Sequence, residues 1–249
     1  MKTAAQTRAI MTKLEAQHPG AQTELHYENP YQLLVATILS AQTTDLRVNQ
    51  VSPALLARYP DARALSDADT REVERLIHAT GFFSQKSRSL VGMAQALVAH
   101  HGGAVPPDMD ALVALPGVGR KTANVVLGHA LGVFGLAVDR HVLRVAGRIG
   151  IADSDDPIVV ERELCGVLPP EGWTLASDTL ILHGRRICKP RPLCDRCSVR
   201  SACDYFRSGA FGSPGARAGS LQPAPRRPAP ARRRKTAAAR GPAKRPKRG

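Results

Sequence analysis

Lys121 occupies a position that suits nucleophilic chemistry, and an acid, Asp139, follows eighteen residues later. Lys121 falls in the first turn of an expected helix, where the positive end of the helix dipole disfavours an ammonium group and partial burial would disfavour it further. A neutral amine is a nucleophile that can form a Schiff base, whereas the ordinary alternative for such a lysine is a cation that contacts phosphate. Asp139 follows the apolar run 136–138, where an isolated acid is usually a helix N-cap.

Four cysteines form a second group with chemical capacity. Cys188, Cys194, Cys197 and Cys203 are separated by five, two and five residues, and the N-terminus lacks a basic-then-apolar secretory pattern. Dense cysteines in a reducing compartment indicate metal ligands rather than disulfides. Four such thiolates hold either tetrahedral zinc or an iron-sulfur cluster, and the spacing alone favours zinc slightly. Cys165 stands apart from this group and is expected to be a buried thiol.

Two helices joined by a short hairpin must position Lys121. One helix is expected to begin near Asp108, and the helix that follows the hairpin carries an apolar stripe. Gly117 and Gly119 permit backbone conformations closed to other residues, so amide N–H groups at the helix start can approach a phosphate oxygen. An ordinary tight turn between two helices is the alternative, which two glycines and a proline could also make, and phosphate binding is the favoured interpretation.

Helix start and stop signals recur along the chain, while segments with the alternating pattern of strands are scarce, so a nearly all-α fold is predicted. Asn29-Pro30 and Asp156-Pro157 each supply an N-cap and a first-turn proline. Two further helices are expected between these starts: a charged one that opens at Ser66 and closes at Gly81, and one from Ser84 to His101.

Positive charge is concentrated in residues 208–249, which contain twelve Lys and Arg and no acidic residue. The preceding residues carry 23 basic and 21 acidic side chains, so they are close to neutral. The composition of 208–249 predicts a disordered tail, which acts either as a DNA-binding arm or as a solubilising or address segment. No apolar stretch approaches the ~18 residues of a membrane helix. A cytoplasmic, nucleoid-associated monomer is expected.

Together these motifs resemble one family. The resemblance rests on the segment Leu115 to Val126, on Val138-Asp139 with His141, on Leu182-His183-Gly184-Arg185 and on the four cysteines. This combination is similar to the endonuclease III branch of the helix-hairpin-helix DNA glycosylase superfamily, over about residues 8–207. The resemblance implies an all-α fold with two helical lobes, a helix-hairpin-helix motif and a disordered basic C-terminal tail.

The resemblance also implies a domain organisation. It divides the chain into an N-terminal helix of residues 1–23 that belongs to the cluster domain, a six-helix domain of residues 24–135, a cluster domain of residues 136–207 and the tail of residues 208–249. The hairpin lies in the six-helix domain, and Asp139 and the four cysteines lie in the cluster domain.

Residue roles follow from the same resemblance. Lys121 would be the nucleophile and Asp139 the catalytic acid, while Gln42 would fill the gap left by an extruded base. Phe82 occupies a wedge position where leucine is also common, and an aromatic wedge can stack in a base step. Further DNA contacts are expected from residues of the hairpin and of two basic sites: Pro116, Gly117, Val118, Gly119, Arg120, His141, Lys189 and Arg191.

The implied cofactor is a [4Fe-4S] cluster held by Cys188, Cys194, Cys197 and Cys203. The family's usual first gap is six residues, and the gap of five in this chain is one residue shorter. The expected role of the cluster is a clip that orders a basic, DNA-facing loop.

The implied activity is that of a base excision repair DNA glycosylase with AP lyase activity on double-stranded DNA that contains damaged bases or abasic sites. It would remove oxidised pyrimidines such as thymine glycol through a Lys121 Schiff base and cut 3′ to the abasic site by β-elimination. The alternatives are an adenine or oxidised-purine glycosylase of the same superfamily and a non-catalytic helix-hairpin-helix DNA-binding protein. The adenine branch usually lacks the hairpin lysine and the purine lyase branch the cysteines, so their joint presence disfavours both.

Overall fold

The computed structural model describes residues 1–209, and these residues form only helices and connecting loops, with no β-strand among them. The all-α fold predicted from the sequence is confirmed. Nearly all of the predicted disordered tail, from residue 210 onward, lies outside the described residues. Within residues 1–209, no helix is long and apolar enough to span a membrane.

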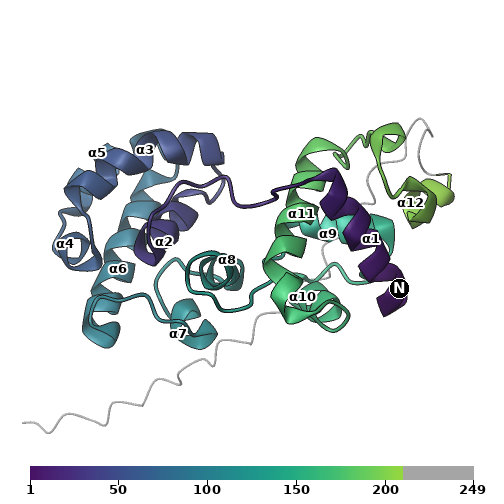
Figure 1. Cartoon of the computed structure of the whole chain (residues 1–249). Helices are drawn as coiled ribbons and strands as arrows, with labels where there is room; N and C mark the ends of the chain where they lie inside the picture. Colours follow the sequence, from purple (N-terminus) through teal and green to yellow (C-terminus); the bar gives the residue numbers. More distant parts are fainter. Residues whose placement is uncertain (210–249) are drawn as a thin grey trace, which may run out of the picture. The chain divides into compact units, whose positions relative to one another are not determined.

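Two separate hydrophobic cores organise the described helices (Figure 1). The first core is enclosed by α2 (Pro30–Leu39), α3 (Asp45–Arg58), α4 (Ala62–Ser66), α5 (Thr70–Ile77), α6 (Phe83–His101), α7 (Met109–Val113) and α8 (Arg120–Ala130). The second is enclosed by α1 (Ala4–Gln17), α9 (Arg140–Ile149), α10 (Pro157–Cys165), α11 (Trp173–Arg186) and α12 (Asp204–Arg207). The predicted two-lobe fold is confirmed, and the precise domain limits remain predictions.

Helix α1 opens the chain but packs in the second core, where Leu14 is fully buried and α1 lies against α11. The segment after α1 then leads to α2 in the first core (Figure 1). A chain that begins in one lobe and returns to it after α8 links the two lobes twice.

Helix α2 lies at the centre of the first core because its sequence is apolar on every side. Leu33, Leu34 and Val35 are all fully buried, and each such side chain stabilises the fold by roughly 1.5–3 kcal/mol. The predicted start is confirmed, since the Asn29 side chain accepts a hydrogen bond from the Gln32 N–H (3.0 Å) and Pro30 follows it. The Asp156-Pro157 start of α10 is confirmed in the same way.

The charged helix expected to open at Ser66 begins later. Helix α4 ends at Ser66, whose hydroxyl donates to the Arg63 carbonyl (2.7 Å) and so does not cap a following helix. Asp69 is the N-cap of α5 instead, and its side chain accepts from the Arg71 N–H (3.0 Å). An aspartate three residues further on therefore replaces the predicted serine cap. The next helix runs to His101 as predicted.

Candidate active site and nucleic-acid interface

The hairpin between α7 and α8 has the geometry expected from its glycines. Gly117 has a φ of 79°, and a Cβ added there would lie 2.6 Å from the Ser89 Cβ on α6. Gly119 is the N-cap of α8 and provides no side-chain acceptor, so the first N–H groups of this helix lack a side-chain cap. Pro116 is exposed, whereas the Val118 side chain is buried in the first core, which leaves only the Val118 backbone for ligand contact.

Lys121 lies in the first turn of α8, as predicted. It forms no hydrogen bond or ion pair with any other residue in the range 1–209, so its amine is available to a ligand. The predicted partial burial is wrong, because the residue is exposed.

Asp139 is the N-cap of α9, which confirms the ordinary expectation for an acid at this position. Its Oδ1 atom accepts hydrogen bonds from the N–H groups of His141 (2.7 Å) and Val142 (3.0 Å). The Oδ2 atom has no hydrogen-bond partner among the described residues. The cap fixes the orientation of the carboxylate and leaves one oxygen for chemistry.

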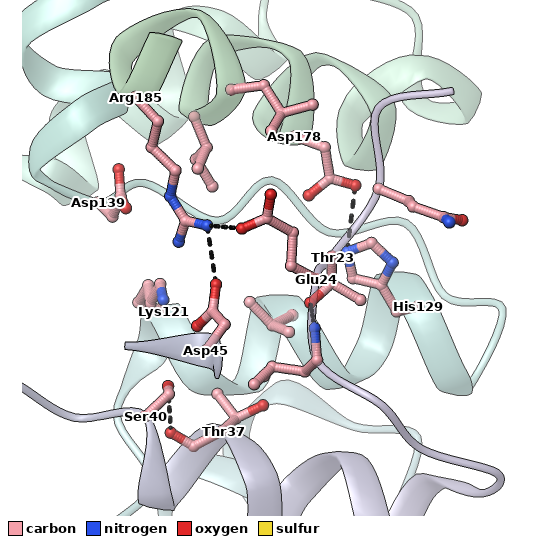
Figure 2. Close-up of a pocket in the computed structure, with 15 residues that line it drawn as sticks. Thr23, Glu24, Thr37, Ser40, Asp45, Lys121, His129, Asp139, Asp178 and Arg185 are labelled. Carbon is pink, nitrogen blue, oxygen red and sulfur yellow. Dashed lines mark hydrogen bonds and ion pairs between the residues drawn. The ribbon is translucent and has the colours of Figure 1, made fainter. Parts of the chain in front are cut away.

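Lys121 and Asp139 line one pocket, with an empty volume of about 510 Å³, although they come from different lobes. Figure 2 shows both side chains at the same side of this pocket, with Arg185 reaching in from α11. Arg185 donates to Glu24 and to Asp45 Oδ2 (2.8 Å), and so ties the second lobe to the start of α3. The pocket therefore joins a free amine, a carboxylate and a fixed cation.

A second pair of polar side chains lies elsewhere in the pocket. His129 of α8 and Asp178 of α11 approach to 3.3 Å between Nε2 and Oδ2 (Figure 2). The sequence did not single out this pair or the contacts of Arg185. Arg185 belongs to the motif Leu182-His183-Gly184-Arg185. Asp45 has only the pattern of an ordinary acid in the first turn of a helix, and no pattern in the sequence distinguishes Glu24.

A larger basic groove adjoins this pocket. It has an empty volume of about 1260 Å³ and is lined by Arg140, His141, Arg144, Arg185 and Lys189. Glu24 and Asp45 also line it, and both are paired with Arg185. Such a lining suits a polyanion. Burial lowers the pKa of His141, and its Nδ1 lies 3.1 Å from Arg144 Nη2.

Two of the predicted DNA contacts, His141 and Lys189, line this groove. Arg191 is exposed but is not part of its lining. Arg120 is engaged elsewhere, because its Nε and Nη2 atoms donate to both carboxylate oxygens of Glu161 on α10 (2.9 and 2.7 Å). A contact between Arg120 and DNA stays a prediction. The backbone N–H of Arg120, at the start of α8, is the donor that remains for such a contact.

Gln42 and Phe82 share an unusual backbone conformation. Their φ angles are 55° and 47°, and among residues 1–209 they are the two non-glycine residues with positive φ. This conformation is rare for a bulky side chain. Both residues are exposed, and 62% of the Phe82 surface is accessible, so its ring is not part of a core.

The four clustered cysteines surround one small cavity with an empty volume of about 340 Å³. None of them forms a disulfide. Burial, followed by the charges of the other three cysteines, raises the pKa of Cys194 to about 11. Among the described residues, no three His, Cys, Asp or Glu side chains are grouped as ligands of a single metal ion. Four thiols around one cavity are donors that suit either a zinc ion or an iron-sulfur cluster.

The short first gap of the cysteine pattern is held by two arginines of α9. Arg148 donates to the carbonyls of Lys189 (2.7 Å) and Pro190 (3.0 Å), and Arg144 donates to the carbonyl of Cys188 (3.1 Å). These bonds fix a tight loop in which Cys188 still lines the same cavity as the other thiols. Cys165, expected to be buried, is half-buried, and burial raises its pKa to about 11.

The chain is similar to a known superfamily and to curated proteins within it. Residues 35–170 match the family described as HhH-GPD superfamily base excision DNA repair protein. Endonuclease III of Synechocystis sp. is 49% identical over 196 residues, which cover 78% of this chain and 90% of the relative. Endonuclease III of Rickettsia conorii is 44% identical over 190 residues, which cover 76% and 90%.

A solved structure agrees with these relatives. The structure of a trapped endonuclease III-DNA covalent intermediate matches with a TM-score of 0.80 at 36% identity, covering 84% of this chain and 99% of that one. The chain therefore belongs to the endonuclease III family, and the predicted resemblance is confirmed.

Proposed function

We propose that this protein excises damaged bases from double-stranded DNA and cuts the strand at the resulting abasic site, as a DNA glycosylase with AP lyase activity. The observation that carries the proposal is the unpartnered amine of Lys121 in one pocket with Asp139. The covalent intermediate with DNA that was trapped for a structural relative supports it. The anomeric carbon is inaccessible inside the base stack, so the damaged nucleotide must first leave the duplex.

The uncapped start of α8 holds the DNA backbone. Successive N–H groups after Gly119 offer donors to a phosphate oxygen, and the absence of a side chain at Gly119 allows a close approach. Lys121 lies one residue into the same helix, so the phosphate contact and the nucleophile share a rigid support. The basic groove lined by Arg140, Arg144 and Lys189 extends this contact along the backbone.

Chemistry then proceeds through Lys121. Its Nζ atom attacks C1′ of the extruded nucleotide, the bond from C1′ to the base breaks, and the base leaves with the electron pair. Asp139 Oδ2 accepts the proton that the attacking amine releases and steadies the positive charge on the sugar. The C1′–O4′ bond of this adduct then breaks and O4′ takes up a proton, which opens the sugar ring and gives the imine. The imine loses a proton from C2′ and expels the 3′ phosphate, which cuts the strand. Hydrolysis of the imine then frees Lys121.

Oxidised pyrimidines such as thymine glycol are the proposed substrate class, in line with the endonuclease III relatives. The pocket suits a polar base, because Glu24, Asp45 and Arg185 present both donors and acceptors to it. Adenine and oxidised-purine glycosylases remain the alternatives within the superfamily, and the hairpin lysine together with the cysteine cluster favours neither.

A panel of duplexes tests this function. Purified protein is incubated with duplexes that contain thymine glycol, adenine opposite 8-oxoguanine, 8-oxoguanine or a preformed abasic site. We expect base release and strand cutting on thymine glycol and cutting at the abasic site. Release from only the purine substrates would move the specificity to another branch, and no cutting of abasic DNA would favour a binding protein without activity.

We also propose that Cys188, Cys194, Cys197 and Cys203 hold a four-iron four-sulfur cluster. When bound, the cluster would cross-link the loop that presents Lys189 and the basic residues beside it to DNA. Iron, acid-labile sulfide and zinc are measured per chain in protein expressed with adequate iron. Four irons and four sulfides are expected, and stoichiometric zinc without sulfide would contradict the assignment.

A further inference from the structure

The two loops that carry Gln42 and Phe82 are joined through a single buried lysine. Lys86 Nζ donates to the Thr43 hydroxyl oxygen (2.8 Å) and to the Thr80 carbonyl (2.9 Å). The Thr43 hydroxyl in turn donates to the same Thr80 carbonyl. Thr43 follows Gln42 directly, and Thr80 lies two residues before Phe82, so this three-membered network connects the two loops at their strained residues.

Burying the Lys86 ammonium group costs free energy of folding. Only 5% of its surface is accessible, and both hydrogen-bond acceptors are neutral oxygens. Burial lowers the pKa of its ammonium group. A buried ammonium without a carboxylate partner costs free energy that an apolar side chain of similar volume avoids. A lysine at this position is therefore better explained by the geometry that it gives to the two loops than by a gain in stability.

The conformation of the two loop residues requires outside support. A non-glycine residue in the left-handed region costs about 1–3 kcal/mol and persists only where its surroundings hold it. Phe82 is the N-cap of α6 and makes no side-chain capping bond, so the helix start alone does not supply this support. The bonds from Lys86, which lies one turn into the same helix, do supply it across both loops.

We propose that Lys86 is a positioning residue that locks Gln42 and Phe82 into one rigid unit, so that both enter the duplex together when a nucleotide is extruded. The proposal rests on the proposed glycosylase function. It assigns to Lys86 no contact with DNA or with the reacting atoms. The hydrogen bonds of Lys86 hold the two exposed side chains in their inserting arrangement before DNA is bound, against the strain of their backbone.

Lys86→Met tests this role, because methionine keeps an unbranched side chain that is only one heavy atom shorter and removes the donor. Base release is measured from thymine glycol in paired duplex, and strand cutting is measured at a preformed abasic site, where extrusion is easier. We expect the variant to slow the first reaction by about tenfold or more and the second much less, since unstacking limits only the first. Fluorescence of 2-aminopurine beside the lesion should rise less on binding, which reports reduced unstacking.

The matched control is Lys13→Met, which makes the same chemical change at an exposed position on α1. It should leave both rates and the fluorescence unchanged. Thr43→Val provides a second route, because it removes the bridging hydroxyl while Lys86 stays in place. We expect it to show the same selective loss with a smaller amplitude, and it decides the question if Lys86→Met does not fold.

A double variant separates positioning from general support. If Lys86 acts through Phe82, then Lys86→Met should add little to the loss caused by Phe82→Ala, because both changes affect one step. Equal losses on the two substrates, or fully additive losses in the double variant, would overturn the proposal while the wild-type activity stands. Wild-type protein that does not cut abasic DNA would instead remove the proposed function, and this proposal with it.

Discussion

The reaction pocket and the two inserting loops differ in what holds their residues in place. Lys121 and Asp139 are each fixed by the start of a helix, at the first turn of α8 and at the N-cap of α9. Gln42 and Phe82 are exposed and left-handed, and the bonds that hold their loops join residues 37 and 43 positions apart in the sequence. The orientation of each reacting group is determined locally, whereas the two loops depend on distant contacts.

This difference has a functional meaning. Groups that transfer protons and form covalent bonds need fixed positions relative to one another, and a helix start on a packed lobe supplies them. Groups that enter a duplex must stay exposed until DNA arrives, so packing cannot hold them. A strained backbone that is held by hydrogen bonds from a buried side chain keeps such residues exposed and ordered without packing. Variants in the two regions should therefore fail in different steps.

The largest effect within this comparison is expected for Asp139→Asn. Asparagine is as good an N-cap as aspartate, so α9 should keep its start and the melting temperature should hold. Base release should slow by about two to four orders of magnitude, because the amide cannot accept the proton from Lys121. Single-turnover base release and thermal unfolding measure the two properties. Unchanged base release would show that Asp139 serves only as a helix cap.

Phe82→Ala should have a smaller and more selective effect. Removing the ring should slow base release from paired duplex by about tenfold or more, with much less effect on cutting at a preformed abasic site. The melting temperature should stay near that of the wild type, because the ring is 62% exposed. A lowered melting temperature that accounts for equal losses on both substrates would place Phe82 in a supporting role instead.

Substitutions in the hairpin should have the smallest effect on activity, and Gly119→Ala serves as the control for Gly117→Ala. Gly117→Ala places a Cβ at a φ of 79° and 2.6 Å from Ser89, so it should destabilise the fold by about 1–2 kcal/mol and weaken binding to damaged and undamaged duplex alike. Gly119→Ala meets no atom within 4 Å at an ordinary φ, so its cost in stability should be smaller. Denaturant unfolding compares the two. Equal destabilisation would contradict the hairpin geometry.

The same contrast explains how far the sequence could be interpreted. Asn29-Pro30 and Asp156-Pro157 located helix starts, and the glycines of the hairpin located Lys121, because each of these signals acts within a few residues. The start expected at Ser66 was wrong because a stronger local cap, Asp69, lay three residues further on. Local rules succeed where one segment determines its own structure.

Arrangements that depend on distant residues were not accessible in this way. Arg185 and Asp45 are 140 positions apart, and only the fold brings them into one pocket. The bidentate contact of Arg120 with Glu161 was missed for the same reason. The exposure of Lys121 was also misjudged, because burial is a property of the folded pair of lobes rather than of one helix start.

Borohydride reduces the imine between Lys121 and C1′ to a stable covalent complex, so trapping reports the nucleophile itself. Wild-type protein on thymine glycol duplex should be trapped, and Lys121→Ala should abolish both trapping and strand cutting. DNA binding by this variant should stay nearly intact, since Lys121 is exposed and supports no other residue in the described part of the chain. Undiminished trapping of Lys121→Ala would place the nucleophile elsewhere and contradict this account.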